Sequence, residues 1–180
     1  SLADMVSFGF LPSAIMYEMF LESPQIPTIG PYINFTAFLI SVFSALRLAK
    51  FNNDTRQADS FIGLPTPANA ILIASLPMIL ERHESFSKYI LNQYVLTALV
   101  LVMCALLVSE IPLMSLKFKN ADLQKNIYRY LLLLFSAILI LFFKFAAVPV
   151  VILMYIILSV IQSKFSNQTV ISGQKHGKRS

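Results

Sequence analysis

Six stretches of mostly apolar residues alternate with short polar or proline-rich connectors along the chain. They cover residues 2–21, 32–51, 64–80, 90–108, 127–143 and 148–162. They have 15 to 20 residues each, and helices of about this length cross the ~30 Å hydrocarbon core of a bilayer. The pattern therefore predicts six transmembrane helices.

The last two stretches are joined by the short segment 144–147. A single straight helix over 127–162 would be about 54 Å long, which exceeds one crossing even when the helix is tilted. We therefore expect a tight hairpin that turns near Lys144 and Pro149. Helix-breaking residues mark the earlier joints: Pro24, Pro27, Gly30 and Pro31, then Gly63, Pro65 and Pro67.

The composition agrees with a membrane protein. Of the 180 residues, 57% are hydrophobic and 13% are charged, and the mean hydropathy is +0.71. A soluble domain carries about 25% charged residues, and one of this size could not bury so many apolar side chains. We expect an all-α integral membrane protein, a polytopic bundle of transmembrane helices.

Several kinds of chemistry are excluded by the residues present. Cys104 is the single cysteine, so an intrachain disulfide and a cysteine metal cluster are ruled out. The two histidines, His83 and His176, have no zinc-site spacing. The sequence contains no glycine-rich phosphate loop, no serine-nucleophile elbow and no nucleic-acid-binding motif.

Basic residues predict the orientation in the membrane. If the first span leaves the cytoplasm, all of the fourteen Lys and Arg residues except Arg82, Lys88 and Lys144 fall on the cytoplasmic side. Both chain ends are then cytoplasmic. The basic tail after Ser163 fits retention on that side and attraction to anionic lipid.

Three charged residues stand at the cytoplasmic rim of the predicted bundle. Asp4 lies about one turn into the first span, while Arg47 and Lys50 share a helix face in the last turn of the second. Charges inside a membrane are costly, which makes all three candidates for a functional site. Ordinary positive-inside anchoring is an alternative for Arg47 and Lys50. Glu110 is left open, because it could pair with Lys117 or line the site.

Four segments, in order, resemble the CDP-alcohol phosphatidyltransferase family and in particular its phosphatidylserine synthases. They are SLADMVSFG at 1–9, ALRLAKFN at 45–52, FIGLPTPA at 61–68 and, more weakly, VSEIP at 108–112 with SLKFK at 115–119. Asp4 matches the fourth aspartate of the family signature. The resemblance places the other three aspartates, and two further helices, upstream of Ser1. It implies about eight spans in a complete protein and no catalysis by this chain alone.

The resemblance also implies a division of the chain. Residues 1–119 would form the C-terminal part of the transferase core, residues 120–163 an additional transmembrane hairpin, and residues 164–180 a disordered basic cytoplasmic tail. It implies a multi-pass protein of a bacterial inner membrane, with its active site on the cytoplasmic side.

The chemistry implied by the family is transfer of a phosphatidyl group from CDP-diacylglycerol to L-serine, giving phosphatidylserine and CMP. By resemblance, Asp4 would bind a divalent metal, Mg²⁺ or Mn²⁺, or accept the serine proton. Arg47 and Lys50 would hold a phosphate or the serine carboxylate, and Asn52, Gly63 and Pro65 would shape the pocket. CDP-diacylglycerol, L-serine, membrane lipids and a second copy of the chain are the expected partners, and nucleic acid is not.

Two alternatives remain at this stage. The acceptor alcohol could be another one, such as glycerol 3-phosphate or inositol. The chain could also be a transport or structural membrane protein without catalysis, although its charges gather at one membrane face and form no path through the bundle.

Overall fold

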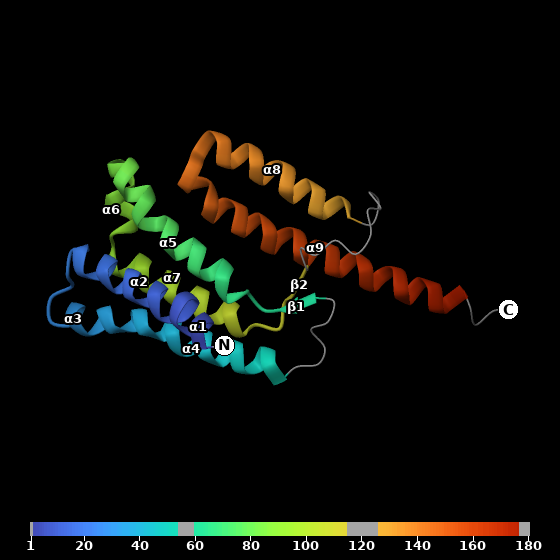
Figure 1. The fold of residues 1–180 in the computed structure, drawn as a ribbon, viewed down its shortest axis with the longest axis horizontal. Coiled ribbons are helices and arrows are strands. Elements are labelled where there is room, and N and C mark those ends of the chain that lie inside the picture. Colours follow the sequence, from blue (N-terminus) through green and yellow to red (C-terminus); the bar gives the residue numbers. More distant parts are fainter. Residues whose placement is uncertain (1, 54–59, 115–125, 177–180) are drawn as a thin grey trace.

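The computed structural model describes residues 2–53, 60–114 and 126–176, and these residues are largely helical (Figure 1). One continuous helix comprises α1 (Leu2–Met5), the π-helical η1 (Val6–Phe10) and α2 (Leu11–Glu22). A second comprises α3 (Gly30–Ile33), the 3-10 helix η2 (Asn34–Phe38) and α4 (Leu39–Asn53). Then follow α5 (Thr66–Arg82), η4 (Glu84–Phe86), α6 (Ser87–Ile90), α7 (Gln93–Val108), α8 (Ile127–Phe143), η5 (Lys144–Ala146) and α9 (Ala147–His176).

The core lies where α2, α4, α5 and α7 pack against one another. Its most buried side chains are fully removed from the surface: Met16, Phe20, Ile40, Ile73, Leu96 and Val100. Apolar side chains gain little from association in lipid, so close packing of these side chains is what holds such helices together. The bundle therefore depends on the fit of these side chains more than on their hydrophobicity.

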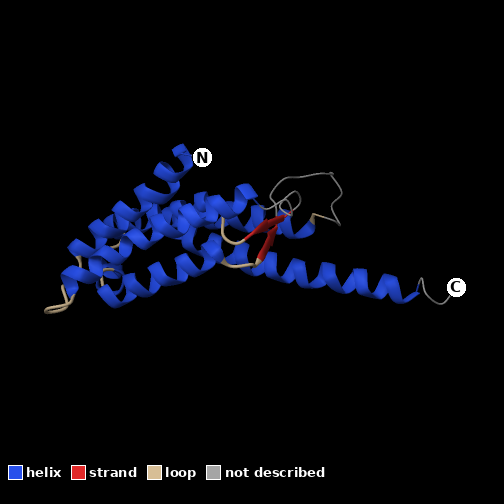
Figure 2. Ribbon diagram, turned by 90° about the horizontal axis from the view of Figure 1, so that it is seen from below, coloured by secondary structure: helices blue, strands red, loops and turns tan. Residues whose placement is uncertain are grey.

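The expected hairpin is present, and it turns at the expected place. Helix α8 ends at Phe143, and Lys144 adopts a positive φ of 50°, which reverses the chain. Helices α8 and α9 then run side by side along one flank of α5 (Figure 1). Helix α9 continues to His176, and its C-terminal part extends beyond the bundle (Figure 2).

Two helical stretches of the described residues are long and apolar enough to cross a membrane. They are 30–53 and 127–162, with mean hydropathies of 1.5 and 2.7, and the second is the stretch that folds back at Lys144. The segments 84–90 and 93–108 meet at an angle of 73° and add a third if they form one span. The six expected helices are thus present in an apolar helical protein, but six crossings are not confirmed.

A small β-ribbon was not expected. Strands β1 (Ser60–Ile62) and β2 (Pro112–Met114) pair antiparallel, with Phe61 opposite Leu113. They connect the segment before α5 to the segment after α7. Tyr155 of α9 donates a hydrogen bond from its hydroxyl to the Met114 carbonyl at 3.0 Å, which attaches the hairpin to the ribbon.

Buried amides connect the helices at the end of the bundle where α2 ends and α7 begins, called the far end below. Gln93, 2% exposed, donates from Nε2 to Gln25 Oε1 at 2.8 Å and to Asn34 Oδ1 at 2.7 Å. Its Oε1 accepts from the backbone N–H of Ile26 at 2.8 Å. A β-carbon on Gly30 would lie 2.9 Å from Gln93 Oε1, so the small residue lets the amide reach its partners. Gln93 thereby links α7 to the α2–α3 connector and to η2.

We expect Gln93→Leu to lower the stability of the protein in detergent, measured as the midpoint of thermal unfolding. Loss of the amide leaves several buried polar partners unsatisfied, and each such group costs about 1–3 kcal/mol. Tyr94→Leu is the matched control, because Tyr94 follows on the same helix and is 70% exposed. Equal midpoints for the two variants would show that the network does not stabilise the far end.

Candidate functional site

A pocket of about 180 Å³ lies at the opposite end of the bundle, between the first helix, α4 and the start of α5. Asp4, Arg47 and Pro65, three of the residues predicted for the site, line it together. A carboxylate and a guanidinium thus face one cavity whose other walls are mostly apolar: Phe8, Leu48, Phe51, Thr66 and Pro67. The structure brings together residues that are more than forty positions apart in the sequence.

A π-helical turn sets the direction of Asp4. Pro12 has no N–H to donate to the carbonyl of Phe8, and its ring would crowd that carbonyl in a regular α-helix. The turn before it widens instead, and the N–H of Leu11 bonds to Val6 five residues earlier. Ser13 Oγ donates to the Gly9 carbonyl at 2.9 Å and contacts Ser41 Oγ at 2.7 Å, which ties the widened turn to α4.

Arg47 is buried, with 3% of its surface exposed. Its guanidinium lies 5.5 Å from the centre of the Phe51 ring, one turn further along α4. This cation–π contact orients the planar group and takes part of the side chain out of solvent. A charge held in this environment interacts more strongly with an anion than an exposed one does, because little water screens it. Simple anchoring at a membrane surface does not require such burial.

The wall formed by Pro65 and Thr66 depends on a turn at Gly63. Gly63 has a φ of +77°, a conformation that residues with a side chain rarely adopt. Its N–H donates to the Ile111 carbonyl at 2.9 Å, and the N–H of Leu64 donates to the Leu106 carbonyl at 2.9 Å. These bonds fix the start of α5 against the end of α7.

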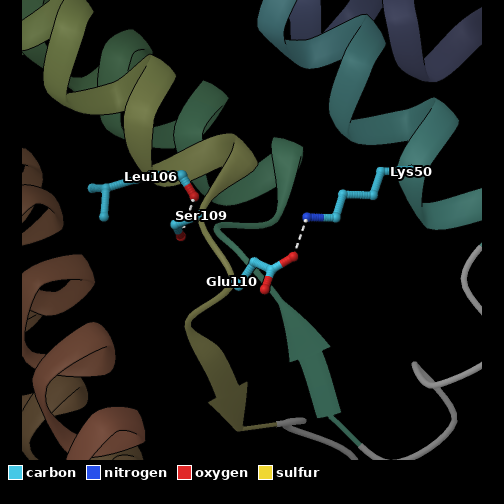
Figure 3. A network of polar contacts seen from close by, with 4 residues as sticks. All are labelled: Lys50, Leu106, Ser109 and Glu110. Carbon is cyan, nitrogen blue, oxygen red and sulfur yellow. Dashed lines mark hydrogen bonds and ion pairs between the residues drawn. The ribbon is translucent and has the colours of Figure 1, made fainter.

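Lys50 lies in the last turn of α4, as expected, but it is not among the residues that line the pocket. It forms an ion pair with Glu110 in the connector between α7 and β2, with Nζ 3.3 Å from Oε1 (Figure 3). The Lys50 side chain is 33% exposed and that of Glu110 76%. An exposed ion pair of this kind stabilises a folded protein by at most about 1 kcal/mol. Lys50 can therefore exchange Glu110 for another anionic partner at little cost.

None of the remaining candidates lines the pocket among the residues that the structure describes. Asn52 is exposed in the last turn of α4 and does not line the pocket. Gly63 acts through the turn rather than as a lining side chain. Lys117, the alternative partner of Glu110, lies outside the described residues, as do Ser1 and the charged residues at 54–59 of the connector after α4.

Five of the lining residues were not among the predicted site residues, although four of them carried a signal in the sequence. Phe8 is four residues after Asp4 and Phe51 four after Arg47, the spacing that places side chains on one helix face. Thr66 and Pro67 belong to the same motif as Pro65. Leu48 had no distinguishing feature beyond lying next to Arg47.

Asp4 by itself does not make a divalent-cation site. Among residues 2–53, 60–114 and 126–176, no group of three or more His, Cys, Asp or Glu side chains could hold a metal ion. Mg²⁺ and Mn²⁺ are oxygen-seeking and usually need more than one anionic ligand. Asp4 alone therefore does not provide the set of anionic ligands that such an ion usually requires.

Comparison with known proteins identifies similar chains. The chain is 32% identical over 167 residues to a CDP-diacylglycerol–serine O-phosphatidyltransferase of Helicobacter pylori, a match that covers 92% of this chain and 66% of the relative. It is 39% identical over 67 residues to the Bacillus subtilis protein of the same name, covering 37% of this chain and 35% of that one. An archaetidylserine synthase of Methanothermobacter thermautotrophicus is 36% identical over 76 residues, covering 42% of this chain and 30% of its own length. No family model matches the chain.

The chain thus spans less than the full length of these relatives: 66%, 35% and 30% of them in turn. The matches nevertheless agree on one kind of enzyme.

We expect Gly63→Ala to destabilise the pocket wall. An added β-carbon would lie 2.7 Å from the Ser109 carbonyl oxygen and 2.8 Å from that of Leu107, and neither backbone atom can move freely. The strained conformation alone costs on the order of 1–3 kcal/mol. The thermal midpoint in detergent should fall by several degrees.

Gly9→Ala is the matched control for this variant. There the nearest atom is the flexible end of Met5, at 2.9 Å, and φ is not in the left-handed region. We expect a smaller decrease in the midpoint. An equal or larger decrease for Gly9→Ala would contradict the special role of the Gly63 turn.

Proposed function

The chain belongs to the CDP-alcohol phosphatidyltransferase family, on its phosphatidylserine synthase-like branch, and from this premise we propose that it transfers a phosphatidyl group from CDP-diacylglycerol to L-serine. The observation that carries the proposal is the pocket shared by Asp4, Arg47 and the turn at Gly63–Pro65. These residues come from the three segments that most resemble phosphatidylserine synthases. Their convergence supports a common chemical task.

The proposed reaction is a direct displacement at phosphorus. The serine hydroxyl oxygen attacks the phosphorus that carries diacylglycerol, and a new P–O bond forms. The bond from this phosphorus to the bridging oxygen breaks, and CMP leaves with the electron pair. The proton of the serine hydroxyl passes to a base, for which Asp4 is the candidate in the pocket.

Arg47 would stabilise the negative charge of the diphosphate. Its planar guanidinium can donate two parallel hydrogen bonds to a phosphate or a carboxylate. Burial and the Phe51 ring keep this group oriented before the substrate arrives, which reduces the cost of ordering it on binding. Lys50 would contribute less, because it would first have to leave Glu110.

A divalent metal remains a proposal. Mg²⁺ or Mn²⁺, when bound, would neutralise charge on the diphosphate. Asp4 would be one of its ligands, and the rest would come from residues beyond those that line this pocket. No step above depends on the ion.

The competing functions find less support. An acceptor such as glycerol 3-phosphate or inositol would use the same donor, but the relatives named above are serine or archaetidylserine enzymes. A transport role would call for polar groups along a path through the bundle. In the described residues the core between the pocket and the far end is apolar, apart from a few buried Ser and Asn side chains.

We also propose a location. The chain would cross a bacterial inner membrane six times, with the pocket on the cytoplasmic side, and could pair with a second copy. Asp4, Arg47, Lys50 and Glu110 gather at the pocket end, whereas Gln93 and the last turn of α5 lie at the far end. This polarity agrees with the distribution of basic residues.

The direct test is a product assay with several acceptors. A form of the protein that carries all four signature aspartates should release CMP from CDP-diacylglycerol when serine is added. Arg47→Ala should lower this activity at least tenfold, since loss of a charge-assisted contact costs about 1.5–3 kcal/mol. Arg82→Ala should have little effect, because Arg82 ends α5 at the far end.

Two results would count against the proposal. Equal losses for the two arginine variants would make Arg47 an anchor. Faster CMP release with glycerol 3-phosphate or inositol than with serine would assign a different acceptor.

The topology has its own test, with a reporter enzyme fused at successive connectors. Fusions after Arg56 or Lys125 should report the cytoplasm, and fusions at Gln25 or Glu84 should report the external side. The reason is the charge asymmetry across the membrane. An external signal from the connector after α4 would contradict both the orientation and the cytoplasmic site.

A further inference from the structure

A second and larger cavity lies between α5 and the α8–α9 hairpin. It has a volume of about 460 Å³ and is open to the surface. Its walls are almost entirely apolar and come from three helices and the turn before α5: Pro65, Pro67, Ala68, Ile71, Leu132, Leu133, Ser136, Ile140, Val148, Val151, Ile152 and Tyr155. This cavity is called the hairpin groove below. Figure 1 shows the α8–α9 hairpin that lies beside α5.

The hairpin groove adjoins the candidate active site. Pro65 and Pro67 line both cavities, so the two share one wall at the start of α5. A molecule with a charged end beside Arg47 could therefore pass over these prolines into the groove. The groove follows α8 from Leu132 to Ile140, which is about 12 Å of helix.

We propose that the hairpin groove holds one acyl chain of the phosphatidyl donor while its diphosphate lies in the pocket. This inference rests on the proposed function and names the part of the lipid that the hairpin binds. The hairpin would then take part in selecting the donor by its acyl chain, in addition to spanning the membrane.

The chemistry of the walls fits a hydrocarbon chain attached to an ester. Ile71, Leu133 and Ile140 are 56%, 50% and 51% exposed, so they offer apolar surface that an acyl chain would cover. Close packing of the acyl chain against these side chains would favour the groove over the surrounding lipid. In the part of the chain that the structure describes, the buried hydroxyl of Ser136 has no hydrogen-bond partner, so it can donate to an ester carbonyl.

The groove is also mechanically connected to the site. Tyr155 lines the groove and bonds to Met114 of the ribbon, and the ribbon pairs with the segment that leads into the Gly63 turn. One wall of the groove is therefore joined, through the ribbon, to the backbone that leads into the pocket.

Photolabelling of the full chain in lipid vesicles tests the proposal. The probe is CDP-diacylglycerol with a diazirine near the end of one acyl chain, and the labelled peptides are mapped. Label is expected on α5 and α8, and excess unlabelled CDP-diacylglycerol should displace it. Ile140→Trp should lower this label about tenfold, which corresponds to about 1.4 kcal/mol of lost binding.

Ile138→Trp is the matched control. Ile138 lies on the same helix and is 42% exposed, but it is not among the residues that line the groove. Its label should stay within about twofold of the original, the scatter typical of a surface substitution. An equal loss in both variants would overturn the proposal, since it would reflect general damage to α8.

A second probe, with the photoreactive group on cytidine, tests the proposed function separately from the hairpin groove. Cytidine label at the pocket together with acyl label away from α5 and α8 would overturn the groove proposal and leave the proposed function standing. Acyl label in the groove that a phosphatidylcholine probe reproduces, and that CDP-diacylglycerol does not displace, would show a bulk-lipid site instead. If the cytidine probe labels no part of the pocket, the proposed function fails and this inference fails with it.

Discussion

Two backbone hydrogen bonds at one glycine turn hold the pocket end of the molecule together. The N–H groups of Gly63 and Leu64 bond to carbonyls at the end of α7 and just beyond it. Because the start of α5 is fixed by these bonds, the pocket wall, the β-ribbon and the position of the hairpin all depend on them. Backbone groups buried among apolar helices must be paired somewhere. Here the pairing joins segments that are more than forty residues apart, and the pocket lies beside them.

The two ends of the bundle use polar groups in opposite ways. At the far end, neutral amides are buried and bonded to one another, which gives a closed and rigid joint. At the pocket end, a buried guanidinium and a carboxylate face a cavity, and the neighbouring ion pair is exposed. The first arrangement joins helices through neutral groups, whereas the second places charged groups at the wall of a cavity. Among the described residues, the core between the two ends contains few polar side chains.

Much of this organisation could be predicted from the sequence, because apolar run length and helix breakers act locally. The six helices, the turn at Lys144 and the meeting of Asp4 with Arg47 and Pro65 followed from run length, charge placement and motif resemblance. The ion pair between Lys50 and Glu110 did not, because it depends on how a connector folds back beside α4. The ribbon was missed for the same reason: three-residue strands carry no periodicity of their own. The hairpin groove is a product of helix packing, and residue types alone do not reveal a space between helices.

The widened turn at Val6–Phe10 determines the direction in which the Asp4 side chain leaves its helix. A π-turn holds one residue more than the α-helical turn it replaces, so everything before it is rotated by about 100° relative to everything after. Asp4 is on one side of this step, and the residues of α2 that pack in the core are on the other. Packing in the core therefore sets the orientation of α2, while the extra residue in the π-turn sets the direction of the Asp4 side chain. Asp4 therefore projects from a different side of the helix than an uninterrupted α-helix would give it, while the core face of α2 is unchanged.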